Sequence, residues 1–212
     1  MSRHAPVAPM AVCAMHGCMT ERTPPRRGYH HGNLKDALLD AARDLVATEG
    51  PAGVTLAEAS RRAGVSPAAP YRHFKDRDAL MAALAERGFA QFADELAQAF
   101  GDGAPDPASA FLRVGDAYLA FARREPGLYG AMFTVCPPGR ETAQGGRAFA
   151  LLAASAGQAA GVERLPQGAI LSIWALAHGA ATLAASGHLD EAEAHAALVA
   201  GVSGILKGAR SD

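Results

Sequence analysis

The stretch TLAEASRRAGVSPAAPYRHF, residues 55–74, has the boundary signals of two short helices joined by a tight turn. Thr55 is the expected N-cap of the first helix, with Glu58 in the capping-box position three residues later. Gly64 is expected to end that helix, because glycine tolerates the left-handed backbone found at helix C-termini. Ser66 is the expected N-cap of the second helix. The stretch therefore predicts a helix-turn-helix.

A helix-turn-helix places its second helix in the major groove of DNA while neighbouring groups bind phosphates. The residues expected to bind phosphate carry hydroxyl, imidazole or ammonium groups: Thr55, Ser66, Tyr71, His73 and Lys75. Helix capping is the first role of the two hydroxyl residues at helix starts, and DNA contact would be additional. The residues expected to reach base edges or sugars are Ala68, Ala69 and Arg72. Arg26 and Arg27 are expected to form a flexible arm that reaches a groove or the backbone.

The rest of the chain has the apolar spacing of amphipathic helices, and we find no strand pattern and no internal repeat. Caps and breaks delimit nine helices, at about residues 34–48, 56–63, 67–74, 77–100, 107–125, 126–133, 141–160, 166–187 and 190–209. The expected fold class is therefore all-α. We expect a disordered N-terminal extension at residues 1–28 and a helix-turn-helix DNA-binding domain at residues 29–75. A connecting helix at residues 76–100 would follow, and then a helical effector-binding and dimerisation domain at residues 101–212. Met19 offers a second plausible start of the chain.

Charge is unevenly distributed along the chain, whose formal net charge is −1. Residues 1–80 hold 11 Lys and Arg against 8 Asp and Glu, whereas residues 81–212 hold 9 against 13. A basic front and an acidic back are typical of a DNA-binding head attached to a separate body.

Three cysteines in 212 residues are too few for a disulfide framework, which favours a reducing, cytoplasmic setting. No apolar run approaches the roughly 20 residues that a membrane span needs, so no membrane partner is expected.

Cys13, His16 and Cys18 lie close together in the sequence. A tetrahedral metal site needs a fourth ligand, and none is visible nearby. No metal or cofactor is therefore expected.

Residues 29–80 resemble the DNA-binding domain of TetR-type transcriptional regulators. The residues that carry the resemblance are Thr55, Ala63-Gly64-Val65-Ser66, Tyr71, His73-Phe74 and Asp76-Arg77-Asp78. The resemblance implies an all-helical homodimer with an effector pocket in its C-terminal body. Ala59 departs from the family pattern, which usually has a larger aliphatic residue there. Pro70 also departs from it, and since proline removes a backbone hydrogen bond we expect a distorted first turn of the recognition helix.

Trp174 and His178 are four residues apart and share one helix face. With Gly179 they resemble the Trp…His-Gly signature of one type of TetR-family C-terminal domain, over roughly residues 165–189. One interpretation places Trp174 and His178 at the effector pocket. The interpretation that we favour is a packed core histidine beside a core aromatic, with Gly179 permitting close helix contact.

A pocket in the body would be lined by apolar and aromatic side chains. Its expected residues are Phe111, Tyr118, Tyr129, Met132 and Phe133, together with Trp174 and His178. Plain core packing is the alternative explanation of the same residues. Because few polar residues converge among them, the expected ligand is apolar or aromatic.

The last two predicted helices are rich in Ala and Gly, which lets helices approach closely. Two such helices from each protomer would form a four-helix dimer interface. Internal packing alone would explain the same composition. The resemblance favours the homodimer.

Together these features predict a ligand-responsive regulator that binds double-stranded DNA, most simply a repressor that leaves a palindromic operator when a small effector binds. The alternative is an effector-independent activator or architectural DNA-binding protein. An enzyme is a remote alternative, because the sequence has no Ser-His-Asp set, phosphate-cradling loop or HExxH motif.

Overall fold

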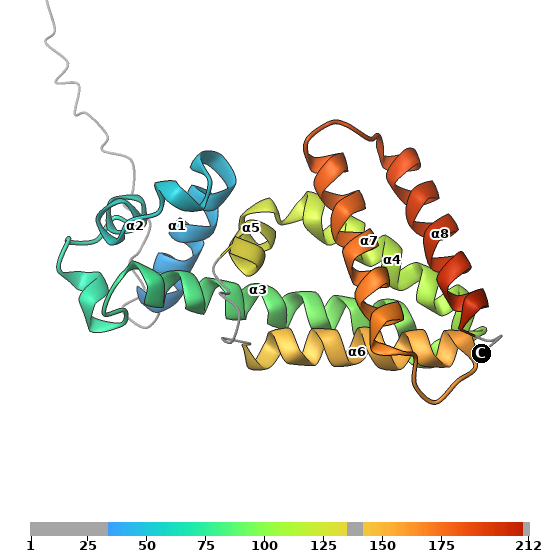
Figure 1. Cartoon of the computed structure of the whole chain (residues 1–212). Helices are drawn as coiled ribbons and strands as arrows, with labels where there is room; N and C mark the ends of the chain where they lie inside the picture. The colour runs from blue at the N-terminus through green and yellow to red at the C-terminus, as the bar shows by residue number, and fades with distance from the viewer. Residues whose placement is uncertain (1–33, 135–141, 210–212) are drawn as a thin grey trace, which may run out of the picture. The chain divides into compact units, whose positions relative to one another are not determined.

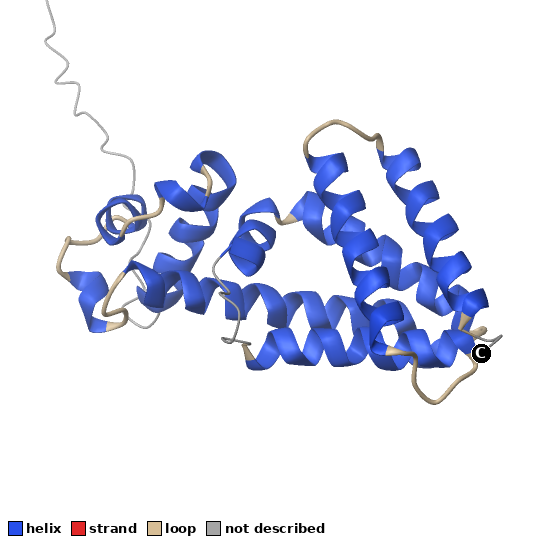
Figure 2. Ribbon diagram, viewed as in Figure 1, coloured by secondary structure: helices blue, strands red, loops and turns tan. Residues whose placement is uncertain are grey.

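Eight α-helices and three short 3₁₀ helices make up the regular structure of the residues that the computed structural model describes, 34–134 and 142–209 (Figures 1 and 2). The α-helices are α1 Leu34–Glu49, α2 Leu56–Ala63, α3 Arg77–Phe100, α4 Pro107–Arg124, α5 Pro126–Thr134, α6 Ala143–Ala160, α7 Gln167–Ala185 and α8 Glu191–Gly208. No strand occurs within those two ranges, so the predicted all-α fold is confirmed. Eight of the nine predicted helices are found.

Short acidic or hydroxyl side chains begin several of these helices. Thr55, Asp76 and Asp106 each accept the backbone N–H three residues further on, at 3.1, 2.8 and 2.9 Å. Each bond satisfies an N–H that a helix start otherwise leaves without a partner. Gly64 ends α2 in the left-handed conformation, with φ of 69°. These boundaries lie where the sequence predicted them.

The second helix of the helix-turn-helix differs from the prediction. It is a four-residue 3₁₀ helix, η2 Ala69–Arg72, and not an α-helix over residues 67–74. Its N-cap is Ala68 and no side chain caps it, so the predicted Ser66 cap is wrong. Pro70 explains the shortening, because its ring nitrogen has no N–H to donate and its ring conflicts with continued α-helix. The predicted distortion is therefore confirmed, and it affects the whole helix.

α3 is the helix against which most of the others pack. It contacts α4, α5 and α6, and also α1 in the helix-turn-helix. Its buried face carries Leu80, Leu84, Phe92 and Leu96, each no more than 4% exposed. A single hydrophobic core consequently runs from α1 to α8. Ala59, the small residue in the head, is fully buried in that core.

α5 lies directly against α1, the first helix of the head. A Cβ on Gly127 would lie 2.9 Å from Arg43 Cγ and 3.0 Å from the Arg43 carbonyl carbon, and would collide with the carbonyl oxygen. A Cβ on Gly130 would meet a Val46 methyl group at 3.0 Å. Glycine at position 127 is therefore required by the close approach of the two helices.

The sequence predicted no apolar run of membrane-spanning length, and α7 departs from that prediction. It is long and apolar enough, by length and composition alone, to cross a membrane. Only 28% of its 18-residue apolar window is buried in the structure. Leu171, Trp174 and Leu183 are 42%, 37% and 44% exposed. Within the described part of the chain, α7 thus keeps an apolar face that its own protomer does not cover.

Several predicted features lie outside the described residues. These are the N-terminal extension at 1–28, the arm at Arg26 and Arg27, and the cysteine–histidine group at Cys13, His16 and Cys18.

Candidate DNA-binding surface and effector site

After the turn of the helix-turn-helix, three exposed residues lie between two buried ones. Pro70 and Phe74 are buried, and the Phe74 N–H donates to the Pro70 carbonyl oxygen at 2.9 Å. Between them Tyr71, Arg72 and His73 are exposed, with 63% of Tyr71 accessible to solvent. The buried pair therefore holds the backbone that presents the three exposed side chains.

The other predicted DNA contacts are mostly accessible too. Those that are exposed are Thr55, Ser66, Ala68 and Lys75. Ala69 is half-buried, which leaves it the least available of the described candidates. Arg26 and Arg27 lie outside the described residues. Accessibility permits DNA contact at these positions, and the contact itself stays a prediction.

Two arginines that the sequence analysis did not single out for this role hold the helix-turn-helix together. Arg77, at the start of α3, donates from Nε to the Val54 carbonyl at 2.9 Å and from Nη2 to the Pro51 carbonyl at 2.6 Å. Arg62 pairs with the Glu49 carboxylate at 2.5 Å and so joins α2 to the end of α1. Every residue has a backbone carbonyl, so the sequence does not show which carbonyls an arginine will bind. The role of Arg77 therefore could not be predicted.

An aromatic cluster fills the body where α3, α4, α5, α6 and α7 meet. Its members are Phe89, Phe92, Tyr118, Phe121, Tyr129, Phe133, Phe149, Trp174 and His178. It gathers most of the aromatic residues of a chain that has only 8 Phe, 4 Tyr and 1 Trp. Many of its rings meet edge to face, as Phe92 and Tyr118 do at 5.0 Å between centroids. This geometry is one that aromatic quadrupoles favour.

Two phenols and one imidazole meet inside the aromatic cluster. The Tyr129 hydroxyl lies 2.8 Å from His178 Nδ1, and the Tyr118 hydroxyl lies 3.4 Å from each of these two atoms. Burial raises the pKa of Tyr118, and it raises the pKa of Tyr129 to about 12. Burial lowers the pKa of His178. All three side chains are therefore neutral near pH 7.

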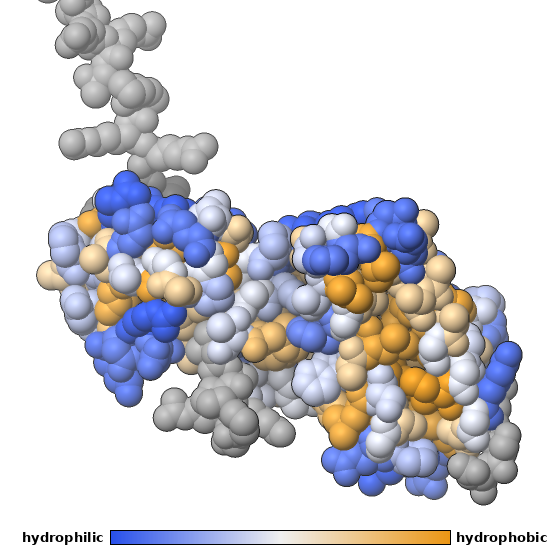
Figure 3. Space-filling view, turned by 45° about the horizontal axis from the view of Figure 1, so that its top comes forward, coloured by the Kyte–Doolittle hydropathy of each residue, from blue (hydrophilic) through white to orange (hydrophobic). Residues whose placement is uncertain are grey.

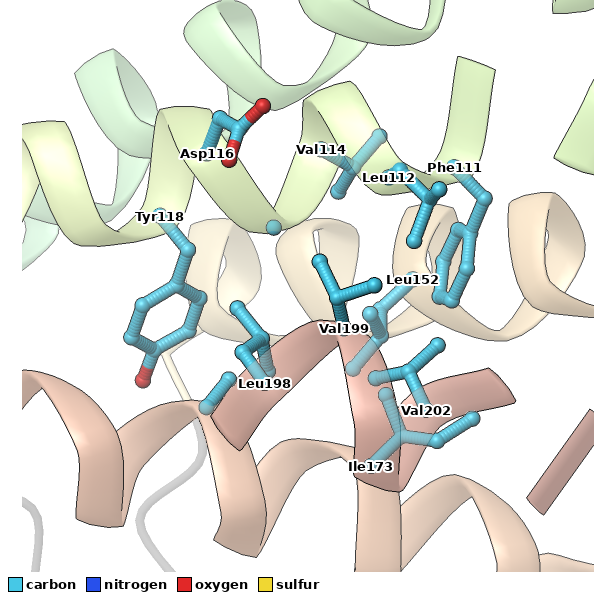
Figure 4. A pocket seen from close by; sticks show the side chains of 12 residues that line it. Phe111, Leu112, Val114, Asp116, Tyr118, Leu152, Ile173, Leu198, Val199 and Val202 are labelled. Atoms are coloured by element: carbon cyan, nitrogen blue, oxygen red, sulfur yellow. The ribbon is translucent and has the colours of Figure 1, made fainter. Parts of the chain in front are cut away.

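The seven predicted pocket residues do not line a single cavity. A cavity of about 20 Å³ lies between α4, α6, α7 and α8, and of the seven only Phe111 and Tyr118 line it (Figure 4). Four others belong to the aromatic cluster: Tyr129, Phe133, Trp174 and His178. Met132 is fully buried beside Gly88. The cavity has room for about one water molecule, whereas ligand pockets usually measure about 300 to 1,000 Å³, so an effector would have to widen it.

The favoured interpretation of the Trp174 and His178 pair is only partly right. Trp174 is 37% exposed and is not a core aromatic. His178 is half-buried and hydrogen-bonded to Tyr129, so it does join the protein interior. A Cβ on Gly179 would meet nothing within 4 Å, so no contact within the described chain requires glycine there. The assignment to the Trp…His-Gly type stays a prediction.

α7 and α8 together present an apolar surface made largely of small side chains, which we call the α7–α8 face (Figure 3). Its exposed residues include Leu171, Ala175, Leu183, Ala196, Ala200 and Gly204. A Cβ on Gly204, as on Gly179, would meet nothing within 4 Å, and neither glycine has a positive φ. Glycine inside a helix costs about 1 kcal/mol relative to alanine. No contact within the described part of the protomer requires glycine at either position.

Both parts of the described chain match families of bacterial regulators. Residues 38–84 match the model described as bacterial regulatory proteins, tetR family, and residues 111–202 match a tetracyclin repressor-like C-terminal domain. An uncharacterized HTH-type transcriptional regulator of Bacillus subtilis, YobS, is 35% identical over 100 residues, which are 47% of this chain and 51% of that relative. One from Mycobacterium tuberculosis is 33% identical over 121 residues, which are 57% of this chain and 59% of that relative. The chain thus spans little more than half the length of these curated relatives.

Solved structures share the arrangement of the helices. A protein with unknown function from Rhodococcus sp. RHA1 is 32% identical, with a TM-score of 0.69, and the match covers 87% of this chain and 100% of that one. The fatty acid degradation regulator FadR from Bacillus halodurans is 15% identical, with a TM-score of 0.64, over 84% of this chain and 97% of that one. The second likeness shows the fold alone.

Proposed function

The chain belongs to the TetR family of transcriptional regulators, and from this premise we propose that it is a homodimeric repressor released from a palindromic operator by a small apolar or aromatic effector. The family consists of DNA-binding regulators and not of enzymes. One observation carries the proposal: a helix-turn-helix with an exposed polar surface and an uncovered apolar α7–α8 face occur in the same chain. The first surface suits DNA and the second suits another protomer.

We assign a role to each part of the chain on this basis. Residues 29–75 bind DNA, residues 76–100 connect, and residues 101–212 bind the effector and dimerise. Residues 1–28 stay a predicted extension. A protein that acts on bacterial DNA works in the cytoplasm, which is where we place this one.

A second copy of the chain is the partner that best fits the α7–α8 face. Glycines at 179 and 204 allow helix backbones to approach closely, and the exposed leucines at 171 and 183 supply apolar area. Two antiparallel helix pairs would then form a four-helix interface with two-fold symmetry. Two-fold symmetry gives two DNA-binding heads, and these match an inverted repeat in the operator.

α5 provides the connection between effector and DNA. One face carries Tyr129 and Phe133 in the aromatic cluster, and another face places Gly127 against Arg43 of α1. A ligand that enters the aromatic cluster displaces α5, and the close contact passes this displacement to the head. The ligand releases DNA if it binds more tightly to the head arrangement that does not fit the operator.

Tyr71→Ala is expected to weaken binding to every DNA sequence alike, by about tenfold, because a phosphate contact carries no sequence information. Fluorescence anisotropy with an operator duplex and with an unrelated duplex measures the effect. Tyr71→Phe is the matched control for the hydroxyl, and since the side chain is 63% exposed neither variant should change the unfolding midpoint. A loss confined to one operator position would contradict the phosphate role.

A gel shift on the DNA that flanks the protein's own gene, repeated with a panel of small molecules, tests the proposed function. We expect a salt-sensitive complex that at least one apolar or aromatic compound dissociates. A complex that every compound leaves intact would instead favour the effector-independent activator or architectural protein.

A further inference from the structure

Three polar atoms lie close together inside the aromatic cluster: Tyr118 Oη, Tyr129 Oη and His178 Nδ1. The Tyr118 hydroxyl lies 3.4 Å from both Tyr129 Oη and His178 Nδ1, which is longer than the usual O–H···O or O–H···N bond. Tyr118 is only 3% exposed, so its hydroxyl is held inside the body, where its contacts with Tyr129 and His178 are both long. Trp174 adds an indole N–H that lowers the pKa of Tyr118, against the larger opposing effect of burial.

Among the described residues, no charged side chain is hydrogen-bonded to these three groups or shifts their pKa values. Burial is the one cause that shifts the pKa of His178, and burial dominates at both tyrosines. The side chains that contact the His178 ring in the described structure are neutral: Tyr118 on α4, and Tyr129 and Phe133 on α5. A ligand carboxylate or ammonium placed here would lose water without gaining a counter-charge.

The groups present are rich in hydrogen-bond donors. Two phenol O–H groups, one imidazole N–H and one indole N–H belong to this part of the cluster, and they are set among hydrocarbon. The Tyr129 hydroxyl and His178 Nδ1 lie 2.8 Å apart and use one of these protons for the bond between them, and when Nδ1 is the donor both phenol O–H groups can donate to a ligand. Such a set suits an uncharged oxygen that accepts more than one hydrogen bond. A ketone, aldehyde, ester or lactone carbonyl has that chemistry.

Tyr118 also joins the polar groups to the cavity, whose lining is apolar apart from Tyr118 itself and Asp116. Asp116 pairs with His195 at 2.6 Å. Its ring forms part of the cavity wall, beside side chains such as Val114 and Leu198, and its hydroxyl is directed away from them (Figure 4). A ligand with a polar end and a hydrocarbon body would therefore meet donors at one end of Tyr118 and apolar side chains at the other.

We propose that the Tyr118 and Tyr129 hydroxyls donate to the carbonyl oxygen of an uncharged apolar effector, with His178 Nδ1 holding the Tyr129 hydroxyl in place, and that the hydrocarbon part of the effector widens and fills the adjoining cavity. The inference rests on the proposed effector response and adds the chemical class of the effector and the residues that recognise its polar end. Trp174 provides the readout, because it is the single tryptophan of the chain and packs against Phe133 and Phe149 in the same cluster.

Four probes that share a ten-carbon chain test this class on the full-length protein: decan-2-one, decanoate, decyltrimethylammonium and decane. Trp174 fluorescence and titration calorimetry, both without DNA, measure the affinities at pH 7.5 and pH 5.5. We expect saturable binding of decan-2-one, stronger than that of the other three, with Tyr118→Phe and Tyr129→Phe each lowering the ketone affinity about tenfold and leaving decane unchanged. Tyr71→Phe, a matched loss of a phenol in the head, should have no effect.

Four results would overturn the inference. Tighter binding of decanoate, increasing as the pH falls, would mean that protonated His178 pairs with an anion. Tighter binding of decyltrimethylammonium would mean that the rings form a cage for a cation. Absence of saturable ketone binding would also exclude the assigned role, and so would a ketone affinity that stays at the wild-type value in both tyrosine variants. Operator binding by the same preparation is measured separately, so failure here leaves the proposed regulator intact.

Discussion

A Leu171→Glu, Leu183→Glu double variant is expected to be monomeric and to bind the operator at least about a hundredfold more weakly than the wild-type chain. In a dimer formed through the α7–α8 face, the new carboxylates would be buried without partners, which costs several kcal/mol. A monomer presents one head instead of two and loses the high local concentration of the second, which is worth about 10²- to 10⁴-fold in affinity. Sedimentation equilibrium and anisotropy with an operator duplex measure the two effects.

Ala150→Glu, Ala154→Glu is the matched control, because both alanines are exposed and belong to α6, which is not part of the α7–α8 face. It adds the same charge and should remain dimeric and bind the operator. The far-ultraviolet circular dichroism of the leucine variant should stay helical, since both leucines are more than 40% exposed in the protomer. A leucine variant that stays dimeric would contradict the placement of the interface.

Gly127→Ala is expected to destabilise the protein by about 1 to 3 kcal/mol and to weaken operator binding. The added Cβ would collide with the backbone of α1 at Arg43, which cannot rotate away as a side chain does. α5 and α1 must then separate, and the head loses its support from the body. Urea unfolding at fixed protein concentration measures the change in the free energy of unfolding.

Gly146→Ala provides a control of opposite sign. A Cβ at position 146 meets nothing within 4 Å and the residue lies in α6, so the change should stabilise the protein by up to about 1 kcal/mol through helix propensity. If the two substitutions changed the free energy of unfolding equally, the close contact between α5 and α1 would not contribute to stability as proposed.

The helix boundaries could be predicted because their signals are local. Asp76 and Asp106 act within three residues of their own positions, and Gly64 needs only its own backbone angle. Pro70 was correctly identified as a distortion, but the sequence did not show that a buried proline would reduce the recognition helix to a 3₁₀ turn. The Ser66 cap failed for the same reason, since it assumed an α-helix beginning at residue 67.

The candidate effector site was predicted less completely, because it depends on contacts between distant residues. His178 meets Tyr129 across 49 positions and Tyr118 across 60 positions of sequence. The spacing of Trp174 and His178 indicated a shared helix face, but it did not show that Trp174 remains exposed. Similarly, a glycine in α5 gives no sign in the sequence that it lies against the backbone of α1.

The most direct test of the account is selection of bound duplexes from a random DNA library by the purified chain. The account predicts enrichment of an inverted repeat, bound by two protomers in a complex that weakens steeply as salt increases. Enrichment of no sequence, or of a single half-site bound by one protomer, would contradict the claim that this chain is a dimeric sequence-specific DNA-binding regulator.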